Sequence, residues 1–235
     1  MEQELPVRTD IADAEEDPNA EIRCASPPCF LHELDPAWLG LPAWPEVRAW
    51  RRQERARLGA LRAAVPLPQR RARDAIIAVH LRAAVPDLAG RHVGFYWPFR
   101  GEYDARPLAR ALHAEGARLA LPVVVQRGRP LLFRPWRPGV RLVPGIWDIP
   151  EPAEGDAVVP DTLLVPLLGF DRHCYRLGHG GGYYDRTLAA MPRRPLAVGI
   201  GFEAARLATI HPQPHDIPMD LVVTEQGLVH RRCLR

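Results

Sequence analysis

The chain has 235 residues, of which 47% are hydrophobic and 25% are charged, a balance typical of one globular domain with a tail. No run of about 18 apolar residues occurs, and the acidic residues 1–21 lack the apolar core of a secretory signal, so we expect a cytoplasmic protein without a membrane span. All 31 basic residues are arginines, which excludes lysine as a phosphate ligand or Schiff-base former.

The net charge of +3 conceals two regions of opposite sign. Residues 1–45 hold ten acids and two arginines, and the remainder holds 29 arginines against 18 acids. We expect an acidic, partly disordered extension over 1–45 and a single α/β domain over 46–235. The basic domain favours anionic ligands, either nucleic acid or small molecules with phosphate and carboxylate groups. Within the extension, Cys24, Cys29 and His32 lack the second ligand pair of a zinc module, so we interpret that stretch as packing.

The first predicted helix spans 46–61 and has two faces. Its apolar stripe is expected to comprise Val47, Trp50, Leu58 and Leu61. A separate basic face is expected to comprise Arg51, Arg55 and Arg62. The prolines of "VPLP" end this helix, and a second helix is predicted over 69–84.

Short apolar runs alternate with helical segments over the rest of the chain. Strands are expected at 92–97, 117–125, 130–136, 162–166 and 195–202, and a terminal hairpin at 219–230. Further helices are expected from Asp104, as the cap, to about 115, and over 183–190. The alternation predicts a three-layer αβα architecture in which helices cover both faces of a mostly parallel sheet.

The stretch "RLGHGGGYYD", residues 176–185, places four glycines within five positions. It lies between a predicted strand and a predicted helix, where open α/β sheets bind ligands and where a helix amino terminus attracts anions. Glycine lets backbone N–H groups approach phosphate oxygens without a clashing Cβ, so the loop favours a phosphate cradle. It is neither a Walker loop nor a dinucleotide fingerprint, and a purely structural loop is the alternative. The flanking Asp185 could hold a Mg²⁺ that bridges phosphate oxygens.

At this point the sequence resembles a known family. The segment "VPLLGFDRHCYRLGHGGGYYDRTL" resembles the signature of 5-formyltetrahydrofolate cyclo-ligases, also called 5,10-methenyltetrahydrofolate synthetases. The segments "YWPFRGEYDARPL", "IWDIPEP" and "HPQPHDIPMDLVVTEQG" are similar to other family segments, so the resemblance covers residues of about 46 to 229. It implies a Rossmann-like fold of the NagB/RpiA/CoA-transferase kind. It also implies that ATP phosphorylates the formyl oxygen of 5-formyltetrahydrofolate, that N10 then attacks, and that ADP and phosphate are released.

The resemblance implies roles for individual residues. ATP binding would involve Arg51, Arg55, Arg176, Leu177, Gly178, His179, Gly180, Gly181, Gly182, Tyr183 and Tyr184. Folate contacts would involve Trp97, Glu102, His179, Gly180, Gly181, Gly182 and Tyr183. Magnesium would be held by Asp185 and Asp216. The expected partners are ATP, Mg²⁺ and reduced folate, with no nucleic acid and no membrane, and the protein is expected to be a monomer.

Some assignments keep alternatives. Arg52 could replace Arg51 if the register slips by one, and Asp220 could replace Asp216 at the metal. Asp185 could simply cap the helix that follows the glycines.

Three further residues have a second interpretation. Glu102 could pair with Arg100 or Arg106, and Trp97 could belong to the core. His179 stands where many family members have tyrosine or arginine, and we interpret it as lining the ligand rather than as a general base. For the whole chain, a catalytically silent relative and an RNA-associated protein are the alternatives.

Overall fold

The computed structural model describes residues 42–230. The chain divides between Ala43 and Trp44, and the unit that begins at Trp44 contains every helix and strand of the described residues. The predicted extension, with Cys24, Cys29 and His32, lies outside the described residues apart from its last few positions. No helix in the described part of the chain is both long enough and apolar enough to cross a membrane.

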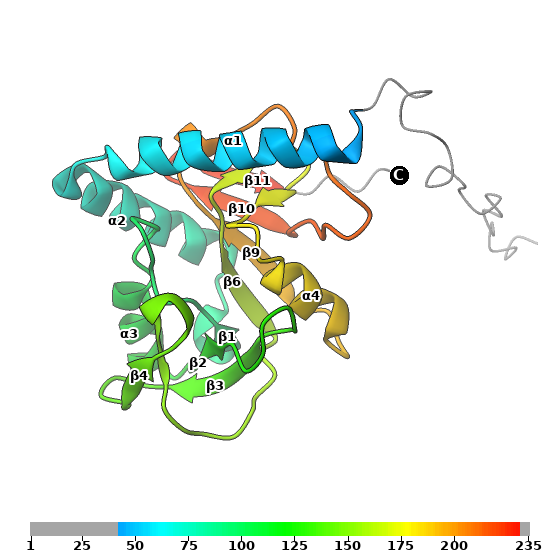
Figure 1. Ribbon diagram of the computed structural model, residues 1–235. Helices are drawn as coiled ribbons and strands as arrows, with labels where there is room; N and C mark the ends of the chain where they lie inside the picture. The colour runs from blue at the N-terminus through cyan, green and yellow to red at the C-terminus, as the bar shows by residue number, and fades with distance from the viewer. Residues whose placement is uncertain (1–41, 231–235) are drawn as a thin grey trace, which may run out of the picture. The chain divides into compact units, whose positions relative to one another are not determined.

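A seven-stranded sheet in the order β11-β10-β9-β6-β1-β2-β3 forms the centre of this unit (Figure 1). Five strands run parallel: β1 (His92–Gly94), β2 (Arg118–Val123), β6 (Thr162–Pro166), β9 (Leu196–Ile200) and β10 (Leu221–Thr224). Antiparallel strands close the two edges: β3 (Leu132–Trp136) and β11 (Gly227–His230). The prediction of a mostly parallel sheet is therefore confirmed.

Four α-helices and several short elements complete the described part of this unit. The helices are α1 (Trp44–Ala63), α2 (Leu67–Ala84), α3 (Arg106–Ala114) and α4 (Tyr183–Ala190). Two small antiparallel sheets pair β4 (Leu142–Pro144) with β5 (Pro150–Pro152) and β7 (Gly169–Phe170) with β8 (Arg176–Leu177). Short 3₁₀ turns lie at η3 (Leu88–Gly90), η4 (Ile146–Asp148) and η5 (Glu203–Ala205).

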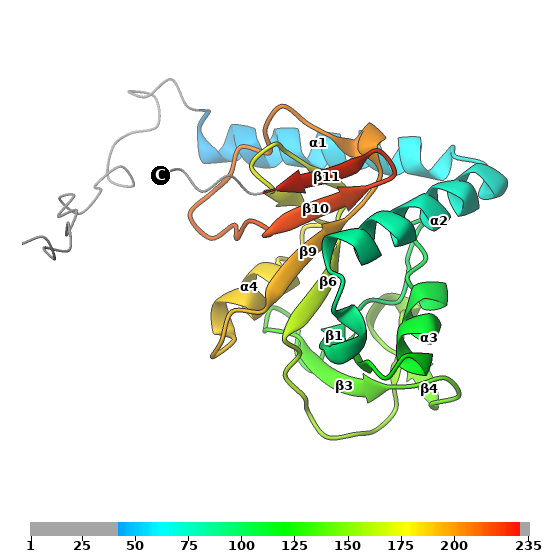
Figure 2. The ribbon, with the colours of Figure 1, turned by 180° about the vertical axis from the view of Figure 1, so that it is seen from behind.

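The helices cover both faces of the sheet (Figures 1 and 2). Leu164 of β6 belongs to a buried cluster with Ile77 of α2 and residues of α3. Its neighbours in the strand, Leu163 and Val165, point to the opposite face and share a cluster with Leu188 of α4. This alternation follows from the two-residue period of a strand, and a strand buried on both faces reads as a continuous apolar run.

The predicted faces of α1 are wrong in two respects. Leu61, assigned to the apolar stripe, is 47% exposed, whereas Arg51 and Arg62 are buried. Val47, Arg51, Leu58 and Arg62 are spaced by four, seven and four residues, so they share the inward face. A buried arginine breaks the usual pattern because its hydrogen-bond partners come from loops more than 35 residues away in sequence.

Two local predictions near β1 also differ from the structure. The strand ends at Gly94 instead of 97: the Phe95 amide still donates to the Ala120 carbonyl, and the chain then leaves the ladder. Asp104 is not the cap residue of α3, because the helix begins after Ala105. Asp104 instead accepts from the backbone N–H and the guanidinium of Arg106.

Candidate active site

The loops that follow β1 and β6 leave the carboxyl edge of the sheet side by side, because these strands are parallel neighbours. From β1 the chain continues to β2 on one side, and from β6 it continues to β9 on the other. The strand order therefore reverses between β1 and β6, which is where open α/β sheets bind ligands. The first loop carries Glu102, and the second carries the glycine stretch.

The amino-terminal half of α1 is fastened to the loop that precedes β10. Arg51 donates from Nε to the Ile210 carbonyl (3.1 Å) and from Nη2 to the His211 carbonyl (2.9 Å). Its guanidinium also pairs with Asp216, which accepts from the Gln213 amide at 2.7 Å. Arg51 is buried while Arg52 is exposed, so Arg51 is the inward residue of the two.

Arg55 and Arg62 reach the glycine loop from the same helix. Arg55 Nε donates to the Gly178 carbonyl at 2.8 Å, and Arg62 Nε donates to the Arg100 carbonyl at 3.0 Å. Arg62 Nη2 lies 3.4 Å from His179 Nε2. Burial lowers the pKa of both arginines; the neighbouring Arg51 lowers that of Arg55 further, while Glu102 opposes the effect on Arg62. The helix thus holds two cations in a partly desolvated environment, which disfavours their charged form. Such perturbed groups are typical of functional sites.

The glycines of the loop make room for the chain's own side chains. A Cβ on Gly178 would lie 2.5 Å from Arg176 Nη1, and a Cβ on Gly181 would lie 2.8 Å from the Tyr183 ring. Gly180 has a φ of +98°, a conformation that side chains disfavour. These glycines therefore have a structural role, because they leave room for neighbouring side chains. Their role in a phosphate cradle stays a prediction.

Asp185 bridges the glycine loop to the segment before β10. It accepts from Arg176 Nη2 at 2.7 Å and from the Ile217 amide at 3.3 Å. Helix α4 begins after Gly182 without a side-chain cap, so Asp185 does not cap it. Arg176 also lies over the Tyr184 ring, with 5.4 Å from the guanidinium carbon to the centroid.

Asp216 precedes Ile217, whose amide donates to Asp185 Oδ1 at 3.3 Å. Asp220 instead accepts from Arg194 and from the Ala197 amide, 2.8 Å from its Oδ2. Of the two alternatives, Asp216 is the one whose neighbour in sequence contacts Asp185. No cluster of three or more histidine, cysteine or acidic residues suited to a metal ion occurs in the described part of the chain.

Glu102 is the buried acid of the site, with a side chain that is 5% exposed. Its Oε1 lies 3.1 Å from His179 Nε2 and 3.9 Å from Arg62 Nη1. Its Oε2 accepts from the Phe99 amide at 2.9 Å, within a tight turn where Arg100 has a φ of 47°. The expected alternative pairing of Glu102 with Arg100 or Arg106 is not observed.

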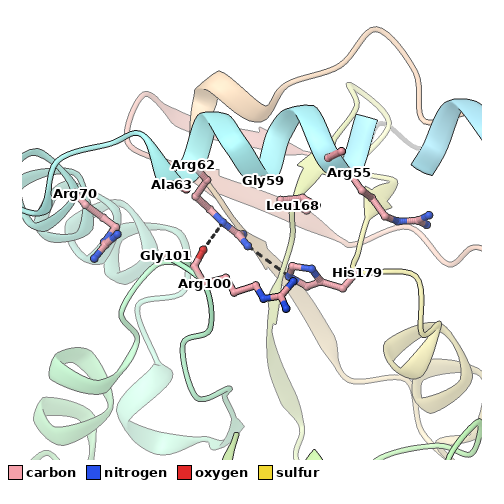
Figure 3. Close-up of a pocket in the computed structure, with 10 residues that line it drawn as sticks. Arg55, Gly59, Arg62, Ala63, Arg70, Arg100, Gly101, Leu168 and His179 are labelled. Atoms are coloured by element: carbon pink, nitrogen blue, oxygen red, sulfur yellow. Dashed lines mark hydrogen bonds between the residues drawn. The ribbon is translucent and has the colours of Figure 1, made fainter. Parts of the chain in front are cut away.

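Arg55, Arg62 and His179 line a cavity of about 730 Å³ (Figure 3). Arg55 and His179 lie toward one end and Arg70, from α2, toward the other, with Arg62 and Arg100 between them. The complete lining is Arg55, Ala56, Gly59, Arg62, Ala63, Arg70, Arg100, Gly101, Leu168 and His179. Four arginines and no acid among the lining residues make this a cavity for anionic groups.

The sequence analysis did not assign Arg62, Arg70 or Arg100 to the site. Arg62 could have been found from its place on the helix face of Arg51 and Arg55, four and seven residues along. Arg70 and Arg100 carry no such signal, because they reach the cavity from a second helix and from a turn.

The other predicted residues lie around this centre. Leu177 is buried beside Leu58 and is part of the core. Trp97 is half-buried against the core with the Arg106 guanidinium 5.2 Å from its ring, and it does not line the cavity. The rings of Tyr183 and Trp147 are nearly perpendicular, with their centroids 6.0 Å apart.

Trp147 was missed although its segment "IWDIPEP" was singled out. Its side chain is 58% exposed, and its φ of 58° lies in the left-handed region, which is unusual for tryptophan. Its ring also lies 4.0 Å from a Cβ built on Gly181. The positive φ and the contact with the glycine loop are tertiary features that no local pattern announces.

Comparison with known proteins gives a consistent result. The family model described as "5-formyltetrahydrofolate cyclo-ligase family" matches residues 47–225. The 5-formyltetrahydrofolate cyclo-ligase of Escherichia coli (strain K12) is 34% identical over 155 residues, which cover 63% of this chain and 85% of the relative. The enzyme of the same name from Mycolicibacterium smegmatis is 34% identical over 158 residues, 62% of this chain and 79% of the relative.

Two solved structures are similar in fold. The NMR structure of Aquifex aeolicus 5,10-methenyltetrahydrofolate synthetase matches with a TM-score of 0.69 and 29% identity, covering 79% of this chain and 94% of that one. A 5,10-methenyltetrahydrofolate synthetase from Mycoplasma pneumoniae matches with a TM-score of 0.61 and 22% identity, covering 74% and 98% of the two chains. The second likeness supports the fold alone.

Proposed function

The chain belongs to the 5-formyltetrahydrofolate cyclo-ligase family, and from this premise we propose that it converts 5-formyltetrahydrofolate and ATP to 5,10-methenyltetrahydrofolate, ADP and phosphate. The observation that carries the proposal is the cationic cavity between α1, the Glu102 turn and the glycine loop, at the point where the strand order reverses. Both proposed substrates are anions, and four arginines line this cavity.

The proposed reaction needs an activated formyl group. A formamide carbon is a poor electrophile and its oxygen is a poor leaving group, and phosphorylation of that oxygen corrects both. N10 then attacks the formyl carbon, and phosphate leaves. The protein must place the γ-phosphate beside the formyl oxygen and spread its charge, so no covalent nucleophile on the chain is required.

The phosphates are proposed to lie at the Arg55 end of the cavity. Arg55 binds the Gly178 carbonyl through Nε alone among the described residues, which leaves its terminal nitrogens for phosphate oxygens. The N–H groups of the glycine loop would add uncharged donors. The reduced folate is proposed to lie toward Glu102, with Trp97 and Tyr183 beside it. Arg51 has a lesser role here, because carbonyls and Asp216 occupy its guanidinium.

A magnesium ion fits the proposed site by its donor chemistry. Mg²⁺ is usually held by one or two carboxylates together with substrate phosphates. Asp185 accepts from the amide of Ile217, the residue after Asp216, and either carboxylate could exchange its arginine partner for the cation. When bound, the ion would neutralise phosphate charge. The Rossmann-like superfamily, the cytoplasmic location and the monomeric state stay predictions.

The test is product formation by the purified protein, followed at the absorption band of 5,10-methenyltetrahydrofolate. We expect absorbance to rise only when ATP, Mg²⁺ and 5-formyltetrahydrofolate are all present. The Asp185→Asn variant keeps the side-chain shape but removes its negative charge. It should need a higher Mg²⁺ concentration for activity. No rise with folded protein that still binds ATP would instead favour a catalytically silent relative.

A further inference from the structure

His179 stands between a carboxylate and a guanidinium that are both buried. Its Nε2 lies 3.1 Å from Glu102 Oε1 and 3.4 Å from Arg62 Nη2. The side chains of Glu102 and Arg62 are 5% and 7% exposed, whereas that of His179 is 41% exposed and lines the cavity. The imidazole is thus held on one side by the protein and open to a ligand on the other (Figure 3).

The two neighbours of Nε2 cannot both form a hydrogen bond with this nitrogen in one state of the neutral ring. Arg62 can only donate a hydrogen bond, and the Glu102 carboxylate can only accept one. Arg62 already donates to the Arg100 carbonyl at 3.0 Å, while Glu102 Oε1 is the nearer neighbour of His179. We therefore assign the proton of the neutral ring to Nε2, from which it is donated to Glu102.

This assignment leaves the lone pair on Nδ1. No residue in the described part of the chain forms a hydrogen bond with Nδ1 of His179. A carboxylate that fixes one ring nitrogen as a donor, with the other nitrogen free toward the ligand, is the arrangement that makes histidine a general base. The imidazolium that results is stabilised by the same carboxylate.

We propose that His179, oriented by Glu102, accepts the proton that N10 of 5-formyltetrahydrofolate loses during ring closure. This inference rests on the proposed function and goes beyond it, because the phosphoryl transfer itself needs no base on the chain. His179 is then a catalytic residue, and Glu102 is its positioning residue in addition to any contact with the folate.

Ring closure moves one proton to His179 and releases phosphate. The N10 lone pair forms a bond to the formyl carbon, which carries the phosphorylated oxygen. The N–H bond of the resulting ammonium breaks, its electrons stay on N10, and the proton moves to Nδ1 of His179. The bond between the formyl carbon and oxygen then breaks, phosphate leaves with its electron pair, and the N10 lone pair completes the methenyl bridge. His179 later releases the proton to solvent.

Arginines from three elements line the cavity that His179 shares, and Arg62 and Glu102 contact its ring directly. Arg55 and Arg62 of α1 and Arg70 of α2 share the cavity, Arg100 lies on the turn, and the Phe99 ring centroid is 6.1 Å from that of His179. The arginine cations repel an imidazolium, and the Glu102 carboxylate attracts it.

The experiment is a single-turnover comparison of wild type with His179→Gln, in which ADP and 5,10-methenyltetrahydrofolate are both measured over time. Glutamine places an amide donor near the position of Nε2, so it can still bond Glu102, but it has no basic nitrogen. His173→Gln is the control, because His173 is exposed and outside the cavity. Loss of a general base slows its step by roughly 100-fold or more.

We expect His179→Gln to form ADP at nearly the wild-type rate and the methenyl product about 100-fold more slowly, with KM little changed. The acid limb of the wild-type pH profile for ring closure should be absent from the variant. A His179→Ala variant should recover part of the rate when imidazole is added, since the side chain then leaves space for it.

Equal slowing of ADP and product in His179→Gln, an unchanged pH profile, or no recovery with imidazole would overturn the proposal and leave His179 as a ligand-binding residue. These outcomes differ from failure of the proposed function, in which the wild-type protein itself forms no methenyl product.

Discussion

The two ends of the buried face of α1 use arginine in different ways. At the amino-terminal end, Arg51 donates to two carbonyls and forms an ion pair with Asp216, so its charge is balanced within the protein. At the other end, Arg62 and His179 share one carboxylate, that of Glu102, beside a cavity lined by arginines. The first arrangement fastens the helix to a loop, and the second leaves net positive charge facing open space.

A buried arginine indicates a binding function only when no acidic side chain of the protein neutralises its charge. A fully paired cation loses its solvation and regains it from fixed partners, so it serves as a structural link. Cations held beside a cavity without matching acids cost stability, and an anionic ligand offsets that cost. Arg55, whose pKa is lowered by burial and by Arg51, lies between these cases on the same helix.

The largest effect is expected from Arg51→Met, because it leaves the Asp216 carboxylate, 10% exposed, without its cation. Removing one partner of a buried ion pair typically costs about 3–5 kcal/mol. We therefore expect the free energy of unfolding, measured in urea, to fall by about 3 kcal/mol. Arg52→Met, at the exposed neighbouring position, should change it by at most about 0.5 kcal/mol. Similar losses in the two variants would contradict the structural role of Arg51.

Arg55→Met should separate binding from stability. The variant loses one hydrogen bond to the Gly178 carbonyl, worth about 1 kcal/mol, so it should stay folded. If the terminal nitrogens of Arg55 bind phosphate, ATP affinity should fall roughly 10- to 100-fold, since hydrogen bonds between charged groups contribute about 1.5–3 kcal/mol. Titration calorimetry measures this change. Arg57→Met, exposed on the same helix, serves as the control, and equal ATP affinities would place the phosphates elsewhere.

A smaller effect is expected at Asp74, a half-buried acid on α2. Oδ1 of Asp74 on α2 is buried and has no hydrogen-bond partner among the described residues, and burial raises the pKa of this carboxyl from 3.8 to about 6. The folded state then binds the proton more tightly than the unfolded state, so stability is lost as pH rises from 3.8 through about 6.

We therefore expect Asp74→Asn to be more stable than wild type by about 1–2 kcal/mol at pH 8 and to match it near pH 4. Denaturant melts at several pH values measure the difference. Asp87→Asn is the opposite case, because Arg91 lowers the pKa of Asp87 and its charge is favourable. A difference for Asp74→Asn that does not change with pH would rule out titration of the buried carboxyl as its cause.

Much of the fold could be predicted because it depends on local pattern. The run Thr162–Pro166 is apolar, buried on both faces and bounded by turns, and the strand β6 has those limits. Helix α4 begins at Tyr183 where the glycines end, as expected. A terminal hairpin was predicted over 219–230, and β10 and β11 pair there as antiparallel strands.

The site was predictable only in part, because its geometry depends on contacts distant in sequence. The family resemblance implied roles for His179 and Glu102, but not that they lie 3.1 Å apart or that Arg62 shares the carboxylate. Arg62 was expected on a basic face separate from the apolar stripe, since no periodicity shows that the turn at Arg100 supplies an acceptor. Trp147 depends on a left-handed backbone that the sequence does not signal.

The most direct test of the central claim is the stoichiometry of one reaction mixture with purified protein, Mg-ATP and 5-formyltetrahydrofolate. We expect one ADP for each 5,10-methenyltetrahydrofolate formed, with neither product appearing when either substrate is left out. ADP formation that continues without folate, or folded protein that binds both substrates and forms no methenyl product, would contradict it.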